Sequence, residues 1–290
     1  MTTFLVTGAN GKLGRHVTQL LLEANAGTVI AASRDTAKLA DLAAKGAELR
    51  RADFDDPASL AEAFKGVDRL LIIATDSLGS GQRLRQHKAA VAAAKAAAVG
   101  HIVYTSMVKP ETSAVTFAGD HLGTEEAIKA TGVPYTLLRN SSYQENLFLS
   151  LPSALKSGQW YSSAGDGRIP YIAHADCARA AAAALIKAPL NQTLTLTGPE
   201  LLTTQEIAAQ ASEATGKPLA VIPVTDEQLA EGMAHAGLPE AIIPMVVSLD
   251  TNTRQGGFDI LTDDVEALTG RKPSPLKAFL DANASALMAS

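Results

Sequence analysis

Three glycines near the amino terminus have a spacing that serves phosphate binding. The stretch TGANGKLGRHV places them at positions 8, 11 and 14, between the apolar run TFLVTG and the helix-like run RHVTQLLLEA. A loop that leads from a strand into a helix turns backbone N–H groups and the positive end of the helix dipole toward one point. We expect the pyrophosphate of a dinucleotide to bind there. The residues predicted to hold it are Gly8, Asn10, Gly11, Lys12, Leu13 and Gly14.

The end of the next apolar run distinguishes between the two nicotinamide cofactors. The run TVIAASR ends on Ser33 and Arg34, at a position where NAD-dependent enzymes usually carry an acidic residue that binds the ribose 2′-OH. A guanidinium instead pairs with a phosphate through two parallel hydrogen bonds. The sequence therefore predicts NADPH as the cofactor, with NADH disfavoured, and it predicts Asp35 as the cap of the following helix.

Two further pairs of residues end predicted strands at the same edge. Asp53 and Phe54 close the run AELRRADF, where a carboxylate can accept from the adenine amino group and a ring can flank the base. Ala74 and Thr75 close the run DRLLIIAT and are expected beside the ribose and nicotinamide. The stretch DDP at 55–57 has the residue types of a helix start.

Alternation of short apolar runs with helical periodicity predicts the elements that position these residues. Such apolar runs continue along the chain as far as HIVYTSM and YTLLRN, and helix-like segments lie between most of them. The pattern predicts an α/β fold with a Rossmann-type, doubly wound parallel sheet. After Asn140 the alternation stops, and a smaller C-terminal α/β substrate lobe is expected. We predict a dinucleotide-binding domain of residues 1–146, with 176–198 returning to its sheet, and a smaller lobe of residues 147–175 and 199–290.

Composition and charge exclude several classes of function. The chain has 290 residues, 47% of them hydrophobic, a formal net charge of −5 and no basic block, so nucleic acid is not expected as a partner. It has neither a signal-peptide pattern nor an apolar run of the roughly 18 residues that a membrane span needs, which predicts a cytoplasmic protein. The single cysteine, Cys177, is predicted to be buried in a helix, and the six histidines lack metal-ligand spacing. A monomer or a homodimer is compatible with these features.

Several stretches together resemble one known family. TGANGKLG, the SR after the second strand, ADFDD, YTLLRN, AGDGRIPYIAHADCA and TGRKPSPLKAFL are similar to the atypical short-chain dehydrogenase/reductases of the NmrA-like group. Within that group the resemblance is to the bacterial NADPH-dependent quinone oxidoreductases of the second type and the triphenylmethane dye reductases. It covers essentially the whole chain and implies an NAD(P)H-dependent oxidoreductase.

One departure from the parent superfamily bears on the mechanism. That superfamily carries a Tyr-x-x-x-Lys pair, in which the Tyr protonates the substrate oxygen and the Lys holds the nicotinamide ribose. Counting back from Glu125, the matching positions hold Phe117 and His121. Ser106 occupies the place of the catalytic Ser, but without the Tyr it is expected at most to hydrogen-bond a substrate oxygen. His121 either contacts the ribose in place of the Lys or is a structural histidine.

The missing acid predicts the kind of acceptor. Losing a positioned general acid costs about 10²- to 10⁴-fold in rate, which a quinone tolerates because hydride addition gives a stable hydroquinone anion. We therefore expect a small-molecule quinone or dye-like substrate. By the resemblance, residues after the sixth strand approach nicotinamide and substrate, with Tyr143 either stacking on a flat ring or serving as a core aromatic. A non-catalytic, NADP(H)-sensing regulator of the NmrA-like type is the alternative. The residues that the resemblance places near nicotinamide and substrate, after the sixth strand, are Asn140, Ser141, Tyr143 and Asn146.

Overall fold

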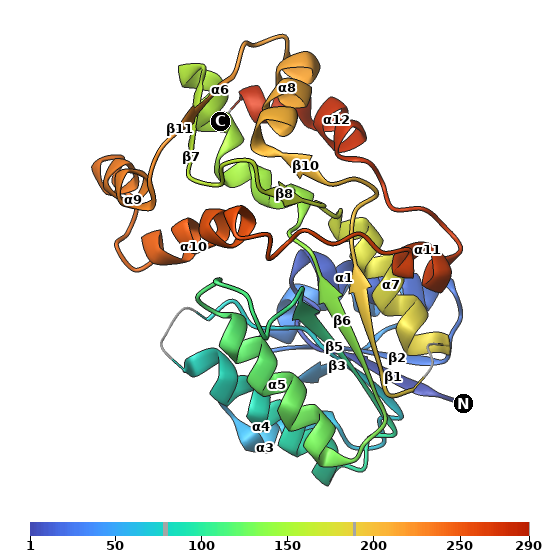
Figure 1. Ribbon diagram of the computed structural model, residues 1–290. Helices are drawn as coiled ribbons and strands as arrows, with labels where there is room; N and C mark the ends of the chain where they lie inside the picture. Colours follow the sequence, from blue (N-terminus) through green and yellow to red (C-terminus); the bar gives the residue numbers. More distant parts are fainter. Residues whose placement is uncertain (78–80, 188–189, 290) are drawn as a thin grey trace.

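The expected strands pair in one parallel sheet. The computed structural model describes residues 1–77, 81–187 and 190–289, and within them the main sheet has the strand order β3-β2-β1-β4-β5-β6-β9 (Figure 1). The order reverses direction between β1 and β4, and such a switch point is where doubly wound sheets bind ligands. The strands are β1 (Thr3–Val6), β2 (Thr28–Ser33), β3 (Glu48–Arg51), β4 (Arg69–Ile72), β5 (His101–Met107), β6 (Tyr135–Asn140) and β9 (Gln192–Leu196).

Helices cover both faces of this sheet (Figure 1). Helices α1 (Lys12–Glu23), α7 (His174–Lys187) and α11 (Asp264–Thr269) pack on one face, and α3 (Pro57–Ala63), α4 (Gln82–Ala96) and α5 (Ala118–Thr131) pack on the other. All seven residues of β5 are buried, as expected of a strand in the middle of a sheet covered on both sides. The predicted Rossmann-type α/β fold is confirmed.

Local differences from the sequence prediction concern helix boundaries. The run TAKLADLAAKG, expected as one helix, forms a 3-10 turn η1 (Thr36–Leu39) and a short α2 (Ala40–Ala44). Helix α5 begins at Ala118, six residues before the run TEEAIKATG that marked it in the sequence. The earlier start places His121 on the helix.

The remaining elements form a smaller unit above the carboxyl edge of the sheet (Figure 1). Its two small sheets pair β10 (Leu202–Thr203) with β8 (Arg168–Ile169) and β11 (Ala220–Pro223) with β7 (Gln159–Ser162). Helix α8 (Thr204–Thr215), strand β11 and helix α9 (Asp226–His235) were expected, and strand β9 returns to the main sheet as expected. The exact boundaries of the two lobes stay a prediction. The other elements, which the sequence did not reveal, are η2 (Gln144–Leu149), α6 (Leu151–Ser157), α10 (Ile243–Arg254) and α12 (Leu276–Met288).

Cys177 lies on α7 and is 1% exposed, so its predicted burial in a helix is confirmed. No helix within the described ranges combines the length and the apolar composition that crossing a membrane requires.

Candidate active site

The glycine loop is built so that α1 packs directly against the end of β1. Gly8 has φ +62°, a left-handed conformation that favours glycine. A Cβ on Gly14 would lie 2.4 Å from the carbonyl oxygen of Gly8, so no larger residue fits unless the loop moves. The backbone N–H of Gly11 donates to the same carbonyl at 2.9 Å. These contacts fix the loop in one conformation.

The amino end of α1 has the features of an anion site. Gly11 is its N-cap, and within the described residues no side chain caps this end and no acidic residue lies in the first turn. The first-turn N–H groups and the helix dipole are therefore not neutralised by the protein itself. Asn10 and Lys12 are exposed beside them, whereas Leu13 packs on the core. The structure thus brings the predicted phosphate-binding residues together.

Arg34 lies just beyond β2, with Ser33 as the last residue of that strand. Its side chain is exposed and forms no hydrogen bond or ion pair with any residue in the described part of the chain. The Asp35 carboxylate accepts from the N–H of Ala37 at 3.1 Å and caps η1, as predicted. The Arg34 guanidinium therefore remains available for a phosphate, whereas the Asp35 carboxylate is engaged as a helix cap.

The carboxylates after β3 are more engaged than the sequence showed. Asp53 accepts from the N–H of Asp55 at 3.1 Å, and Phe54 packs against the core beside it. Asp56 caps α3, as expected for a helix start. Asp55 was expected to share that function, but its carboxylate instead accepts from the side chain of Gln86 at 2.6 Å. It joins the end of β3 to α4.

The residues after β4 are tied to the neighbouring strand and helix. The N–H of Ala74 donates to the Thr105 hydroxyl at 2.9 Å, and the N–H of Thr75 donates to Nε2 of His87 at 2.9 Å. The Thr75 hydroxyl donates to the side-chain oxygen of Gln86 at 2.9 Å. The Thr75 hydroxyl and both backbone N–H groups are therefore engaged within the protein.

Ser106 is bound to a buried ion pair. Its hydroxyl donates to Oε1 of Glu125 at 2.6 Å, and the Arg139 guanidinium donates to both oxygens of the same carboxylate, at 2.9 and 2.6 Å. Glu125 is 0% exposed, so the three groups satisfy one another inside the protein. Because its proton is already donated, Ser106 is not free to donate to a substrate oxygen in this arrangement.

Phe117 and His121 lie at the start of α5. Phe117 is the N-cap of the helix, and the two rings meet edge to face with centroids 5.8 Å apart. Burial, together with the nearby charges of His87 and Arg83, lowers the pKa of His121 to about 3, so the ring is neutral near pH 7. The position that the resemblance matches to the superfamily lysine therefore holds an uncharged histidine.

Unpaired buried polar atoms mark the end of β6. Asn140 and Ser141 are 6% and 3% exposed, yet the Asn140 side-chain oxygen and the Ser141 hydroxyl have no hydrogen-bond partner among the described residues. The Asn140 amide donates to the Tyr143 hydroxyl at 2.9 Å. Asn146 is exposed on η2. Such unpaired groups cost free energy unless a ligand or water satisfies them, and they fit a polar ligand at this edge.

The sequence reasoning missed a histidine and a carboxylate that meet beside these residues, His174 and Glu145. The backbone N–H of His174 donates to the Glu145 carboxylate at 3.1 Å, and the His174 ring packs on Tyr143 with centroids 4.2 Å apart. Burial lowers the pKa of His174. The negative charge of Glu145 acts to raise it, and the positive charge of Lys12 acts to lower it further. His174 lies within the stretch that carried the family resemblance, but no local spacing marked it.

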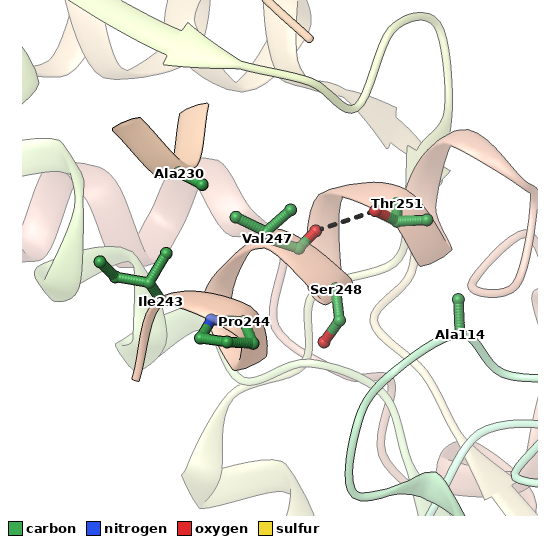
Figure 2. Close-up of a pocket in the computed structure, with 7 residues that line it drawn as sticks. All are labelled: Ala114, Ala230, Ile243, Pro244, Val247, Ser248 and Thr251. Carbon is green, nitrogen blue, oxygen red and sulfur yellow. Dashed lines mark hydrogen bonds between the residues drawn. The ribbon is translucent and has the colours of Figure 1, made fainter. Parts of the chain in front are cut away.

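A pocket of about 300 Å³ lies between α10, α9 and the loop after β5. Figure 2 shows its seven lining residues, none of which was predicted as a site residue. The Ser248 hydroxyl donates to the carbonyl of Met245 at 2.7 Å, and the Thr251 hydroxyl lies 2.9 Å from the Asp226 carboxylate. Because these hydroxyls are used internally, the wall suits an apolar ligand group. The lining residues are Ala114, Ala230, Ile243, Pro244, Val247, Ser248 and Thr251.

Hydrogen bonds tie the loop after β5 to α10. The Asn252 side-chain oxygen accepts from the Ser113 hydroxyl at 3.0 Å and from the N–H of Ala114 at 2.9 Å. The Ser248 hydroxyl accepts from the N–H of Thr116 at 3.2 Å. This loop starts after the strand that carries Ser106 and ends at Phe117, so α10 helps to hold the loop in place. Among the described residues there is no group of three or more His, Cys, Asp or Glu side chains arranged to hold a metal ion.

Comparisons with known proteins agree on one family and one fold. A model of the NmrA-like family matches residues 1–280. Quinone oxidoreductase 2 of Escherichia coli is 36% identical over 266 residues, 91% of each chain, and an NAD(P)H azoreductase of Xenophilus azovorans is 29% identical over 284 residues, 97% of this chain and 98% of the other.

Two solved structures are similar over nearly the whole chain. The E. coli NADPH-dependent quinone oxidoreductase complexed with NADPH superposes with a TM-score of 0.92 at 34% identity, covering 96% of this chain and 99% of the other. The Citrobacter sp. triphenylmethane reductase complexed with NADP(H) gives 0.90 at 34% identity, covering 97% and 99%.

Proposed function

The chain belongs to the NmrA-like family, and we propose that it is a reductase that passes hydride from NADPH to a quinone or a similar flat electrophile without a tyrosine general acid. The family expected from the sequence is confirmed, as is its likeness to bacterial quinone oxidoreductase and triphenylmethane reductase. The protein is an NAD(P)H-dependent oxidoreductase that uses NADPH.

The residues present fit this cofactor. The amino end of α1 offers N–H donors for the pyrophosphate, and Arg34, which has no partner in the part of the chain that the structure describes, offers its guanidinium for the 2′-phosphate. Asn140 ends β6 and Ser141 follows it, and the buried side-chain oxygens of both, which have no partner among the described residues, would bind the polar groups of the nicotinamide half. When bound, NADPH supplies a hydride.

The observation that carries the acid-free mechanism is the residue set at the start of α5. Phe117 has no proton to give, His121 is neutral and buried, and the Ser106 proton is donated to Glu125. Hydride addition to a quinone gives a hydroquinone anion that takes its proton from water. The protein then contributes by holding donor and acceptor together and by excluding competing water.

Mixing the protein with NADPH and a small benzoquinone tests this proposal. We expect the dihydronicotinamide absorbance to fall much faster than without protein, with NADH as the poorer donor. An ordinary aliphatic ketone is the control acceptor and should give little turnover, because its alkoxide product needs an acid. Saturable binding of NADPH without turnover of any quinone would instead identify a cofactor-sensing regulator. The cytoplasmic location, the monomeric or dimeric state and the absence of a nucleic-acid partner stay predictions.

A further inference from the structure

A backbone N–H fixes the proton of one buried histidine. The N–H of Thr75 lies 2.9 Å from Nε2 of His87, and a backbone N–H can only donate, so this nitrogen must be the unprotonated one. His87 is 0% exposed, and burial, with the charge of Arg83, lowers its pKa to about 4. A neutral imidazole carries a single proton. In His87 that proton is therefore on Nδ1.

The protonated Nδ1 of His87 determines the next two hydrogen bonds. It faces the Thr124 hydroxyl at 2.9 Å and the Tyr104 hydroxyl at 3.3 Å. Thr124 donates its own proton to the carbonyl of Asp120 at 2.6 Å, which leaves it free to accept from His87. Tyr104 cannot donate to a nitrogen that already carries a proton. Thr124 also interacts with the Tyr104 hydroxyl, but its oxygen already accepts from His87, so the Tyr104 proton goes to Nδ1 of His121, 2.8 Å away.

We infer that His121 offers a neutral Nε2–H donor to a bound ligand, and that His87 and Tyr104 are the positioning residues that fix this tautomer. Because Nδ1 of His121 accepts from Tyr104, its one proton is on Nε2. Nε2 has no partner among the described residues, and the residue keeps 6% of its surface exposed on the first turn of α5. Its partner would be an oxygen, either a ribose hydroxyl of the cofactor or the reducible oxygen of the acceptor, and this part rests on the proposed function.

Burial first, and then the charges of His87 and Arg83, lower the pKa of His121 and keep this donor neutral. Arg83 faces it from α4, and its guanidinium lies 4.6 Å from the centre of the Phe117 ring that flanks His121. Asp120 and Glu125 on α5 act on the nearby Tyr104, whose pKa burial raises far above its usual range. Passing a proton along the chain would leave a buried tyrosinate. His121 therefore stabilises negative charge by donating a hydrogen bond and keeps its proton.

Nuclear magnetic resonance on the whole protein tests the tautomers directly. Two-bond proton–nitrogen correlations of ¹⁵N-histidine protein separate Nδ1–H from Nε2–H rings, and loss of signals in His87→Asn and His121→Asn assigns them. At neutral pH we expect Nδ1–H for His87 and Nε2–H for His121. A charged His121, or one protonated on Nδ1, would overturn the inference. This readout needs neither NADPH nor a quinone, so it is independent of the proposed function.

Replacing Tyr104 with Phe tests what the fixed tautomer does. Without its partner hydroxyl, His121 should populate both tautomers and lose part of its donor strength, about fivefold in the affected step for one hydrogen bond. If the donor binds the ribose, the dissociation constant of NADP⁺ rises. If it binds the acceptor, kcat at saturating NADPH falls with NADP⁺ affinity unchanged.

The matched control is His101→Asn, which alters another buried histidine, the first residue of β5. Its Nε2 bonds to Thr136 and takes no part in the chain of hydrogen bonds that ends at His121. We expect wild-type kinetics from this variant. Unchanged NADP⁺ affinity and unchanged kcat in a folded Tyr104→Phe protein would contradict the positioning role. If that variant does not fold, the tautomers of the wild-type protein still decide the inference.

Discussion

At the scale of single residues, the candidate site is described by which side chains already have hydrogen-bond partners within the protein. Asp35 caps η1, the Ser106 hydroxyl donates to Glu125, and the Thr75 hydroxyl donates to a side chain of α4. Arg34 has no partner among the described residues, although it stands among acidic and polar neighbours. An unpaired guanidinium at a cofactor-binding edge is available for a phosphate without breaking an existing contact.

Replacing Arg34 with Ala should therefore change cofactor choice. We expect NADPH binding to weaken by about 1.5 to 3 kcal/mol, the usual contribution of a hydrogen-bonded charge pair, while NADH binding stays nearly unchanged. Titration calorimetry with both cofactors measures the difference. Arg271→Ala, at another exposed arginine, is the control for the change in net charge. Equal losses for NADPH and NADH would mean that Arg34 does not bind the 2′-phosphate.

Sequence reasoning was more informative about backbone than about side-chain partners. The glycine loop and Arg34 could be predicted from the nearby sequence, because their chemistry depends on neighbours in the chain. The partners of Ser106 could not be, since Glu125 and Arg139 come from a helix and a strand that only the fold brings together. His174 and Glu145 meet for the same reason.

At the scale of elements, the junction of β1 and α1 carries the cofactor hypothesis. A Cβ on Gly14 would meet the Gly8 carbonyl at 2.4 Å, whereas one on Gly232 in α9 would meet nothing within 4 Å. Close packing against the loop therefore requires glycine at position 14. Nothing near Gly232 requires a glycine there, and this residue lowers the helix propensity of α9.

Two alanine substitutions separate these cases. Gly14→Ala should push α1 away from the loop, cost about 1 to 3 kcal/mol of stability as overpacking does, and weaken binding of NADPH and NADH alike. Gly232→Ala should stabilise the protein by about 0.5 to 1 kcal/mol and leave binding unchanged. Urea unfolding and cofactor titration report both quantities. Normal cofactor affinity in a folded Gly14→Ala protein would argue against the loop as the binding site.

The sheet was predictable and part of the smaller lobe was not, for physical reasons. Strands such as β5 are buried on both faces and read as continuous apolar runs with helices between them. Helix α10 begins IPMVVSLD, so a proline and β-branched residues precede its polar half and hide the helical period. Its contacts with Ser113 and Ala114 connect segments more than 130 residues apart, which no local pattern reveals.

At the scale of the whole molecule, buried neutral histidines link stability to pH. Burial lowers the pKa of His121 to about 3 and those of His87 and His101 to about 4, below the 6.5 of an exposed histidine. Between these values the unfolded chain binds more protons than the folded protein. Stability is therefore full above pH 6.5 and is lost as the pH falls toward 4.

The free energy of unfolding should consequently fall by up to about 1.4 kcal/mol per pH unit for each such histidine. Carboxylates with lowered pKa values, such as Asp226, lose their contribution only at lower pH, and Asp250, whose pKa burial raises, acts in the opposite direction. Urea unfolding at a series of pH values measures the slope. His101→Gln should reduce it by one histidine's share. A stability that does not change from pH 7 to pH 5 would show that the histidines are not buried neutral.

The central claim is that the protein positions NADPH against an acceptor that needs no proton from it. The most direct test is single-turnover hydride transfer from bound NADPH to a benzoquinone, followed from about pH 6.5 to about pH 9. We expect a rate that is fast compared with the protein-free reaction and independent of pH across this range. A rate that falls as the pH rises through a single pKa would reveal a protein acid, and would contradict the account.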